Sequence, residues 1–180
     1  MHKTYYILHG YNGSSEENWF PWLKAELEKR GDKAIVPALP NPDKPQLDEW
    51  LSTLRSSIQE NGEGTIIGHS LGGVLAMRYL EQDGHPEKIV LVAVPFKKLA
   101  NIPGIDNFLE TPWGITPEQL QSTKFVIIGS EDDPYVPVEH IKNWAALLGI
   151  DPVMFKDRRH FGRNHAGLIQ TEFPEILEYL

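Results

Sequence analysis

A serine between two glycines carries the clearest chemical signal in this chain. The residues concerned, Gly68-His69-Ser70-Leu71-Gly72, match the pattern G-x-S-x-G. In that pattern the serine lies on a tight turn between a strand and a helix, where larger side chains two positions away would collide. The turn exposes the hydroxyl at a helix N-terminus, where the helix dipole favours developing negative charge. Ser70 is therefore the candidate nucleophile.

An acidic loop further along the chain offers the carboxylate that such a serine needs. A serine hydroxyl attacks only when a histidine removes its proton and a carboxylate orients that histidine. In folds that carry this serine motif between a strand and a helix, the acid follows the serine in the chain and the histidine comes last. Residues 129–137 follow an apolar run and contain Glu131, Asp132 and Asp133. Asp133 is preferred because it begins the familiar loop form Asp-x-x-Val-Pro, Asp132 is the next choice, and an acidic helix cap is the alternative.

Two histidines near the end of the chain compete for the role of base. Both His160 and His165 follow the last apolar run, at residues 153–155. His160 is preferred because a short loop would bring its imidazole back over the edge of the sheet. His165 would need a longer excursion, so an ordinary loop position is expected for whichever histidine is not the base.

The remaining histidines carry less information. His9 is expected in the loop after the first strand, and His69 is the variable residue of the serine motif. His2, His85 and His140 have no motif around them and are expected on the solvated surface. No spacing of histidines and carboxylates suggests a metal site, so neither a metal nor a cofactor is expected.

Two backbone N–H groups are candidates for an oxyanion hole. The carbonyl oxygen of an attacked substrate becomes an anion and needs donors that are already in place. One expected donor is the N–H of Leu71, the residue after the serine. The second is expected from the loop at residues 8–13, where His9-Gly10 is a common beginning and the N–H of Tyr11 is the candidate. A plain glycine turn is the alternative for this loop.

These residues need a sheet that brings several strand ends together. Short apolar runs predict strands at residues 5–8, 34–36, 65–67, 89–94, 125–128 and 153–155. Helical spacing predicts helices at residues 19–30, 47–58, 71–81, 138–148 and 172–180. The alternation predicts an α/β fold, a three-layer α/β/α sandwich around a mainly parallel sheet of about six strands. Chemistry in such sheets lies at the carboxyl ends of the strands, where every candidate residue above is expected.

Composition bounds the rest of the interpretation. The 180 residues are expected to form a single domain over residues 1–180, with 41% hydrophobic and 23% charged residues as in ordinary globular proteins. The formal net charge of −8 argues against nucleic acid or an anionic membrane surface as a partner. The absence of cysteine excludes a thiol nucleophile and disulfides. No signal-peptide pattern or long apolar run is present, so a cytoplasmic protein is expected.

Four pieces of the sequence, in order, resemble a known family. They are the His9-Gly10 loop with the run Asn18-Trp19-Phe20-Pro21-Trp22-Leu23, the serine motif, residues 129–137, and His160-Phe161. Together they look like the small serine hydrolases of the α/β-hydrolase fold that include a retinoblastoma-binding protein and many bacterial relatives. The resemblance covers nearly the whole chain. It implies a compact α/β-hydrolase core with little lid and a triad of Ser70, Asp133 and His160, since the family's histidine is usually followed by phenylalanine.

The sequence also departs from that family. Glycine usually precedes the family's histidine, whereas Arg159 stands there in this chain, and the loop at residues 161–170 looks longer than usual. The retinoblastoma-binding motif of one member requires a cysteine, which this chain lacks. Retinoblastoma protein is therefore not expected as a partner of this chain, and the sequence indicates no other protein partner.

The expected activity is hydrolysis of a small-molecule carboxylic ester through an acyl-enzyme on Ser70. The segment at residues 95–121, where this fold often inserts a lid, is short, which favours small or exposed acyl groups. The sequence leaves amide bonds open as substrates. The alternative is a hydrolase-fold binding protein with little or no turnover, which would need no complete triad. An acyltransferase is a third option, whereas a dehalogenase would want aspartate in place of Ser70.

Overall fold

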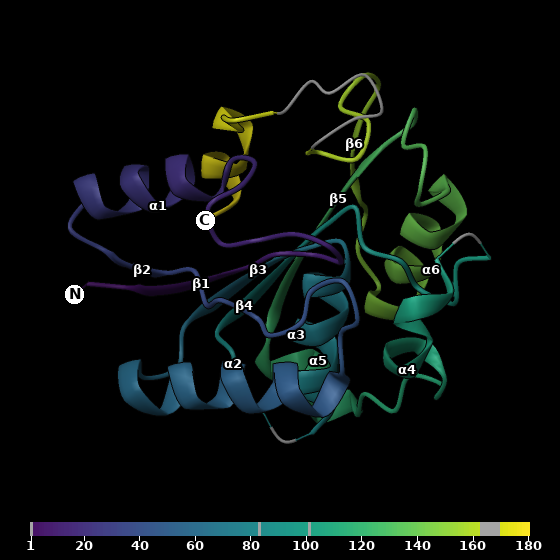
Figure 1. Ribbon diagram of the computed structural model, residues 1–180, viewed down its shortest axis with the longest axis horizontal. Coiled ribbons are helices and arrows are strands. Elements are labelled where there is room, and N and C mark those ends of the chain that lie inside the picture. Colours follow the sequence, from purple (N-terminus) through teal and green to yellow (C-terminus); the bar gives the residue numbers. More distant parts are fainter. Residues whose placement is uncertain (1, 83, 101, 163–169) are drawn as a thin grey trace.

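Strands and helices alternate along the chain, as Figure 1 shows. The computed structural model describes residues 2–82, 84–100, 102–162 and 170–180. In chain order its elements are β1 (Thr4–Leu8), α1 (Phe20–Lys29), β2 (Lys33–Ile35), α2 (Leu47–Asn61), β3 (Thr65–His69), α3 (Leu71–Glu81), β4 (Lys88–Val92), the 3₁₀ helix η1 (Pro103–Ile105), α4 (Asp106–Leu109), α5 (Pro117–Ser122), β5 (Lys124–Ser130), α6 (Val138–Leu148), β6 (Val153–Phe155) and the 3₁₀ helix η2 (Pro174–Tyr179).

The six strands form one parallel sheet in the order β2-β1-β3-β4-β5-β6. The predicted α/β architecture with a parallel sheet is therefore confirmed. The chain passes from β1 to β2 on one side and then returns past β1 to β3 on the other. The strand order thus reverses at β1, and in open sheets a crevice forms at such a point, beyond the carboxyl ends of the strands. The loops that leave β1 and β3 there carry Gly10 and Ser70.

Side chains of each strand alternate between two apolar layers. Tyr6 and Leu8 pack in the layer that includes α2, α3 and α6, whereas Tyr5 and Ile7 pack in the layer that includes α1 and η2. The alternation follows because successive side chains of a strand point to opposite faces. In Figure 1, α1 and the C-terminal segment lie over one face of the sheet and α2 lies over the other. Both faces are covered, as is usual for parallel sheets.

Two predicted elements differ from those observed. The helix predicted at residues 172–180 is instead the 3₁₀ helix η2, whose Ile176 and Tyr179, three positions apart, pack on the α1 layer. A 3₁₀ helix has three residues per turn, so this spacing places them on one face. The strand predicted at residues 89–94 ends at Val92. Within the described ranges, no helix has the length and apolar character needed to cross a membrane.

Candidate active site

Ser70 lies between β3 and α3 in a backbone conformation that non-glycine residues avoid. Its φ is 53° and its ψ is −122°, which costs on the order of 1–3 kcal/mol and persists only where the surroundings enforce it. The flanking glycines explain how the turn closes. A Cβ on Gly68 would lie 2.3 Å from the Cα of Gly73, and a Cβ on Gly72 would lie 2.4 Å from the carbonyl oxygen of Leu8. The collisions expected from the motif are therefore real.

The loop after β1 lies directly against the serine. A Cβ on Gly10 would be 2.9 Å from Ser70 Cβ and 3.4 Å from Ser70 Oγ, so only a residue without a side chain fits there. The structure thus brings the predicted oxyanion loop to the predicted nucleophile. Leu71 is the first residue of α3, and its N–H belongs to the first turn, where amides have no acceptor within the helix.

His9 holds the shape of this loop. Its Nδ1 donates to the carbonyl oxygen of Gly10 at 2.9 Å, and its Nε2 accepts from the N–H of Leu39 at 3.2 Å. Burial lowers the pKa of His9, which keeps the ring neutral in this arrangement. The Gly10 carbonyl also accepts from the N–H of Gly13 at 3.2 Å. Because C=O and N–H point in opposite directions across a trans peptide, the N–H of Tyr11 points away from the loop interior.

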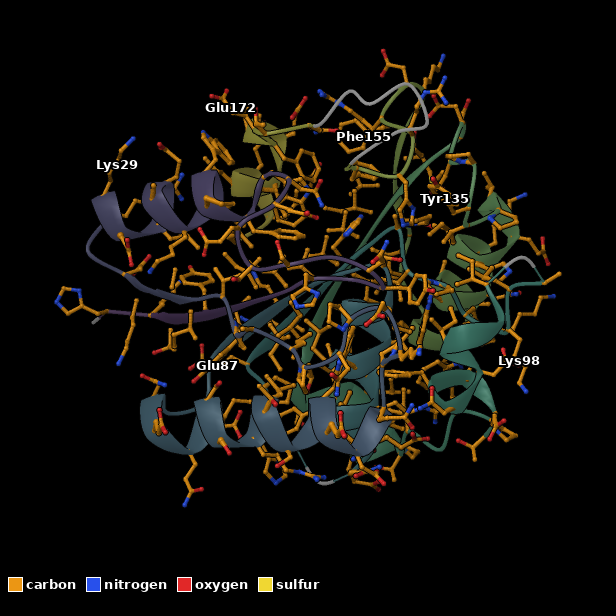
Figure 2. The ribbon with its side chains drawn as sticks, in the orientation of Figure 1. Lys29, Glu87, Lys98, Tyr135, Phe155 and Glu172 are labelled. Atoms are coloured by element: carbon orange, nitrogen blue, oxygen red, sulfur yellow. The ribbon has the colours of Figure 1, made fainter. Side chains whose placement is uncertain are left out.

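Asp133 and His160 form a hydrogen-bonded pair beyond the ends of β5 and β6. Nδ1 of His160 donates to Asp133 Oδ2 at 2.8 Å, and the side chains are 14% and 2% exposed respectively. The other carboxylate oxygen, Oδ1, accepts from the N–H groups of Tyr135 and Val136 at 2.8 and 3.0 Å. This fixes the carboxylate, and the carboxylate in turn fixes the proton of His160 on Nδ1. Figure 2 shows Tyr135 and Phe155 at this end of the sheet.

Asp132, the second choice for the acid, binds backbone instead of an imidazole. Its Oδ1 accepts from Ser130 Oγ at 2.7 Å and from the N–H of Arg159 at 2.8 Å. The Ser130 hydroxyl, followed by the Arg159 N–H, holds the pKa of Asp132 below its usual value. Asp132 therefore contacts the residue before His160, while Asp133 contacts the ring of His160.

His69 is a site residue that the sequence reasoning missed. Its Nε2 donates to the carbonyl oxygen of His160 at 2.7 Å, and the two ring centroids are 4.9 Å apart. Burial, together with the nearby His160, lowers the pKa of His69 to about 3. The ring is thus a neutral donor at neutral pH. A histidine just before the serine was the only available signal in the sequence, and nothing local connects it to residue 160.

Comparisons with known proteins show the family of this chain. A family model described as serine hydrolase matches residues 5–180 of the chain. The chain belongs to the serine hydrolase family. The resemblance seen in the sequence is thereby confirmed.

Individual relatives of this serine hydrolase point the same way. The hydrolase YdeN of Bacillus subtilis (strain 168) is 35% identical over 153 residues, which is 82% of this chain and 80% of YdeN. The crystal structure of the ydeN gene product superposes with a TM-score of 0.87, covering 98% of this chain and 96% of that chain at 30% identity. Serine hydrolase RBBP9 of Rattus norvegicus is 26% identical over 161 residues, covering 88% of this chain and 82% of RBBP9.

The segment between β4 and β5 of this serine hydrolase is packed down on the core. Phe108 is fully buried, and the ring of Trp113 packs at a tilt on Trp144 of α6, with 4.6 Å between the ring centroids. Arg78 of α3 binds this segment by donating hydrogen bonds to the carbonyl oxygens of Phe108 at 3.0 Å and Thr111 at 2.7 Å. The Arg78 guanidinium also lies 4.0 Å from the Trp113 ring centroid. Core packing therefore accounts for much of the apolar surface of this segment.

The surface positions expected for the other histidines of the serine hydrolase are found for some of them and not for others. His140 is 4% exposed, and its Nδ1 accepts from the N–H of Phe96 at 3.0 Å, so the surface position expected for it was wrong. Its burial could not be foreseen because it depends on the segment that folds over α6. His2 and His85 are exposed, and His165 lies outside the described residues. Across the described part of the chain, no group of three or more histidine, cysteine, aspartate or glutamate residues could hold a metal ion.

Proposed function

We propose that this serine hydrolase cleaves carboxylic esters through an acyl-enzyme on Ser70. The observation that carries the proposal is the 2.8 Å hydrogen bond from His160 Nδ1 to a buried Asp133 carboxylate that has no other imidazole partner among the described residues. This bond leaves the lone pair of His160 Nε2 available to accept a proton. Gly10 lies against the Ser70 hydroxyl, and His69, the neighbour of Ser70, binds the backbone of His160.

The first half of the reaction transfers the acyl group to the enzyme. Nε2 of His160 takes the proton of Ser70 Oγ while Oγ bonds to the ester carbonyl carbon. The electron pair of the C=O bond moves onto oxygen, which the N–H groups of Tyr11 and Leu71 stabilise; donors of this kind are each worth roughly 10²–10³ in kcat. The tetrahedral intermediate then breaks its bond to the alkoxy oxygen. That oxygen leaves as an alcohol with the proton from His160.

The second half releases the acid by the same groups. Water gives a proton to His160 Nε2 as its oxygen bonds to the acyl carbon, and the intermediate expels Ser70 Oγ, which regains the proton. A carboxylic acid leaves and the free enzyme returns. Asp133 keeps the proton on Nδ1 and stabilises the imidazolium that exists between the two transfers.

The substrate class follows from the short and packed segment at residues 95–121. Its apolar side chains Ile105, Phe108 and Leu109 are buried in the core. Small or solvent-exposed acyl groups fit such a site better than long lipid chains. The formal net charge of −8 does not favour polyanionic substrates.

The proposal is tested by intact mass after reaction with a fluorophosphonate. The wild-type protein should gain one phosphonyl group, Ser70→Ala should gain none, and His160→Ala should react slower by orders of magnitude. His165→Ala serves as the matched control and should react like wild type. Loss of reaction in His165→Ala alone would transfer the role of base to His165.

Turnover separates an enzyme from a hydrolase-fold binding protein. Steady-state rates with p-nitrophenyl acetate, p-nitrophenyl laurate and an acetyl p-nitroanilide should rank the short ester first. A wild-type protein that neither takes the phosphonyl group nor hydrolyses any of the three would contradict the proposal and favour the binding protein.

A further inference from the structure

The backbone on both sides of His160 adopts conformations that side chains disfavour. Arg159 has a φ of 48° and Phe161 has a φ of 53°. For residues other than glycine such left-handed conformations are uncommon and are held by surrounding contacts. The chain closes a turn here, with the N–H of Phe161 donating to the carbonyl oxygen of Arg158 at 2.9 Å. His160 therefore sits inside a strained turn that something must hold.

Four side chains from three separate segments hold this turn. Ser130 Oγ accepts from the N–H of Arg158 at 3.0 Å, and Asp132 Oδ1 accepts from the N–H of Arg159 at 2.8 Å. On the other side, His69 donates to the carbonyl oxygen of His160 and Trp19 Nε1 donates to that of Phe161, both at 2.7 Å. Each backbone group is thus bound by a side chain distant in sequence. The members of this set are Trp19, His69, Ser130 and Asp132.

Asp132 is the member that contacts the strained Arg159 directly. The Asp132 residue is largely exposed, so burial in the core does not account for its position. The Ser130 hydroxyl donates to the same Oδ1 atom that receives the Arg159 N–H. Ser130 is 1% exposed and is therefore a fixed support for the carboxylate. The two consecutive carboxylates after β5 bind different parts of the turn. Asp133 binds the ring of His160, and Asp132 binds the backbone N–H of Arg159.

The side chain of Arg159 does not explain its own conformation. It is exposed, so packing of the side chain does not hold the backbone of residue 159. Glycine adopts positive φ without steric cost, whereas arginine needs an external contact to stay there. The Asp132 carboxylate supplies that contact in this chain.

We propose that Asp132 is a positioning residue of this serine hydrolase, which holds Arg159 in its left-handed conformation and so sets His160 against Asp133. The inference rests on the proposed function, because it assigns Asp132 to the service of the proposed base. It differs from an acid role for Asp132, which would require a negative charge on that side chain.

Two substitutions at residue 132 separate positioning from charge. Asp132→Asn keeps an acceptor oxygen at Oδ1 and should retain kcat within about threefold, whereas Asp132→Ala should lower kcat about tenfold or more with little change in KM, since small misplacements of catalytic groups are costly. The rate of phosphonylation should follow kcat. Equal losses in Asp132→Asn and Asp132→Ala would contradict positioning through an acceptor oxygen.

The Arg159→Gly variant tests whether the protein needs Asp132 because of the strained backbone at residue 159. In Arg159→Gly, residue 159 adopts positive φ freely. Adding Asp132→Ala to this variant should therefore lower kcat much less than it does in the protein that carries Arg159. A merely structural role of Asp132 predicts the same loss in both backgrounds, and that result would overturn the proposal. Thermal unfolding of every variant checks that the fold is intact.

A readout that needs no turnover keeps this inference separate from the proposed function. The imidazole proton on His160 Nδ1, identified by its absence in His160→Ala, should give a downfield NMR resonance because it is hydrogen-bonded to Asp133. We expect Asp132→Ala to broaden or abolish this resonance and Asp132→Asn to preserve it. A sharp, unshifted resonance in Asp132→Ala would refute the positioning role even if the wild-type protein proved unreactive toward fluorophosphonate.

Discussion

His69 donates a hydrogen bond from its buried imidazole to the main-chain oxygen of His160, 2.7 Å away. His69 is the last residue of β3, and Ser70 follows it directly. The bond therefore links the turn that carries the proposed nucleophile to the turn that carries the proposed base. Because the two turns lie on different strand ends, a rigid link of this kind limits how far they can move apart.

The stability of the protein should depend on pH through His69. Burial lowers the pKa of His69 from 6.5 to about 3, so between these values the unfolded chain binds a proton that the folded chain does not. The free energy of unfolding should thus fall as pH decreases below 6.5, by at most about 1.4 kcal/mol per pH unit from this group, and gain nothing above 6.5. Urea unfolding at pH 7.5, 6 and 5 measures the slope.

His69→Gln should flatten this acid slope, because glutamine can donate but does not titrate. Burial also lowers the pKa of His9 and of His140, so part of the slope should remain. His85→Gln, at an exposed position, is the control and should leave the slope unchanged. An identical slope in wild type and His69→Gln would show that His69 is protonated in the folded protein.

Removing the charge of Asp133 should nearly abolish turnover without unfolding the chain. In Asp133→Asn the side-chain oxygen can still accept one bond, but the neutral amide no longer stabilises an imidazolium, and kcat should fall by about three orders of magnitude. Ester hydrolysis over a pH range measures the loss. Glu131→Gln, an exposed neighbour in the same loop, should keep the wild-type rate. If Glu131→Gln lowered kcat as much as Asp133→Asn does, the assignment of Asp133 as the acid would be wrong.

A methyl group on Gly10 should impair the proposed nucleophile. The new Cβ would lie 2.9 Å from Ser70 Cβ and 3.4 Å from its Oγ, so one of the two turns must shift. We expect Gly10→Ala to slow phosphonylation about tenfold or more, as displacements on this scale do in active sites. Gly104→Ala is the matched control, since its Cβ would meet only the Tyr11 ring at an ordinary 3.6 Å. Unchanged labelling in Gly10→Ala would mean that the β1 loop does not border the reacting hydroxyl.

Arg78 should matter for stability far more than an exposed arginine. Its side chain is 3% exposed and pairs with Glu81 while holding the segment that contains Phe108. Arg78→Ala leaves buried acceptors unpaired and should lower the free energy of unfolding by about 3 kcal/mol. Arg55→Ala, at an exposed position, should change it by no more than about 0.5 kcal/mol. Equal effects of the two substitutions in chemical denaturation would argue that the segment is not anchored through Arg78.

Local patterns were enough to predict most of the sheet, because the central strands β1, β3 and β4 are buried on both faces and form short apolar runs in the sequence. They failed where packing between distant segments decides the conformation. The last helix was expected to be α-helical, but it is the 3₁₀ helix η2, which packs on the α1 layer through residues that include Ile176. His140 was expected in solvent, and the chain at Phe96 covers it.

The sequence by itself determined the turn at Ser70, because the glycines of the motif satisfy steric limits that any such turn imposes, whether the colliding group is nearby in the chain, as Gly73 is for Gly68, or on another strand, as Leu8 is for Gly72. It also narrowed the acid to adjacent carboxylates. Only the tertiary structure decided that Asp133 binds the ring of His160 while Asp132 binds the backbone N–H of Arg159. It also decided that His69, 91 residues before His160, binds the carbonyl oxygen of His160. Those contacts depend on where three strand ends lie relative to one another, and no local preference encodes that distance.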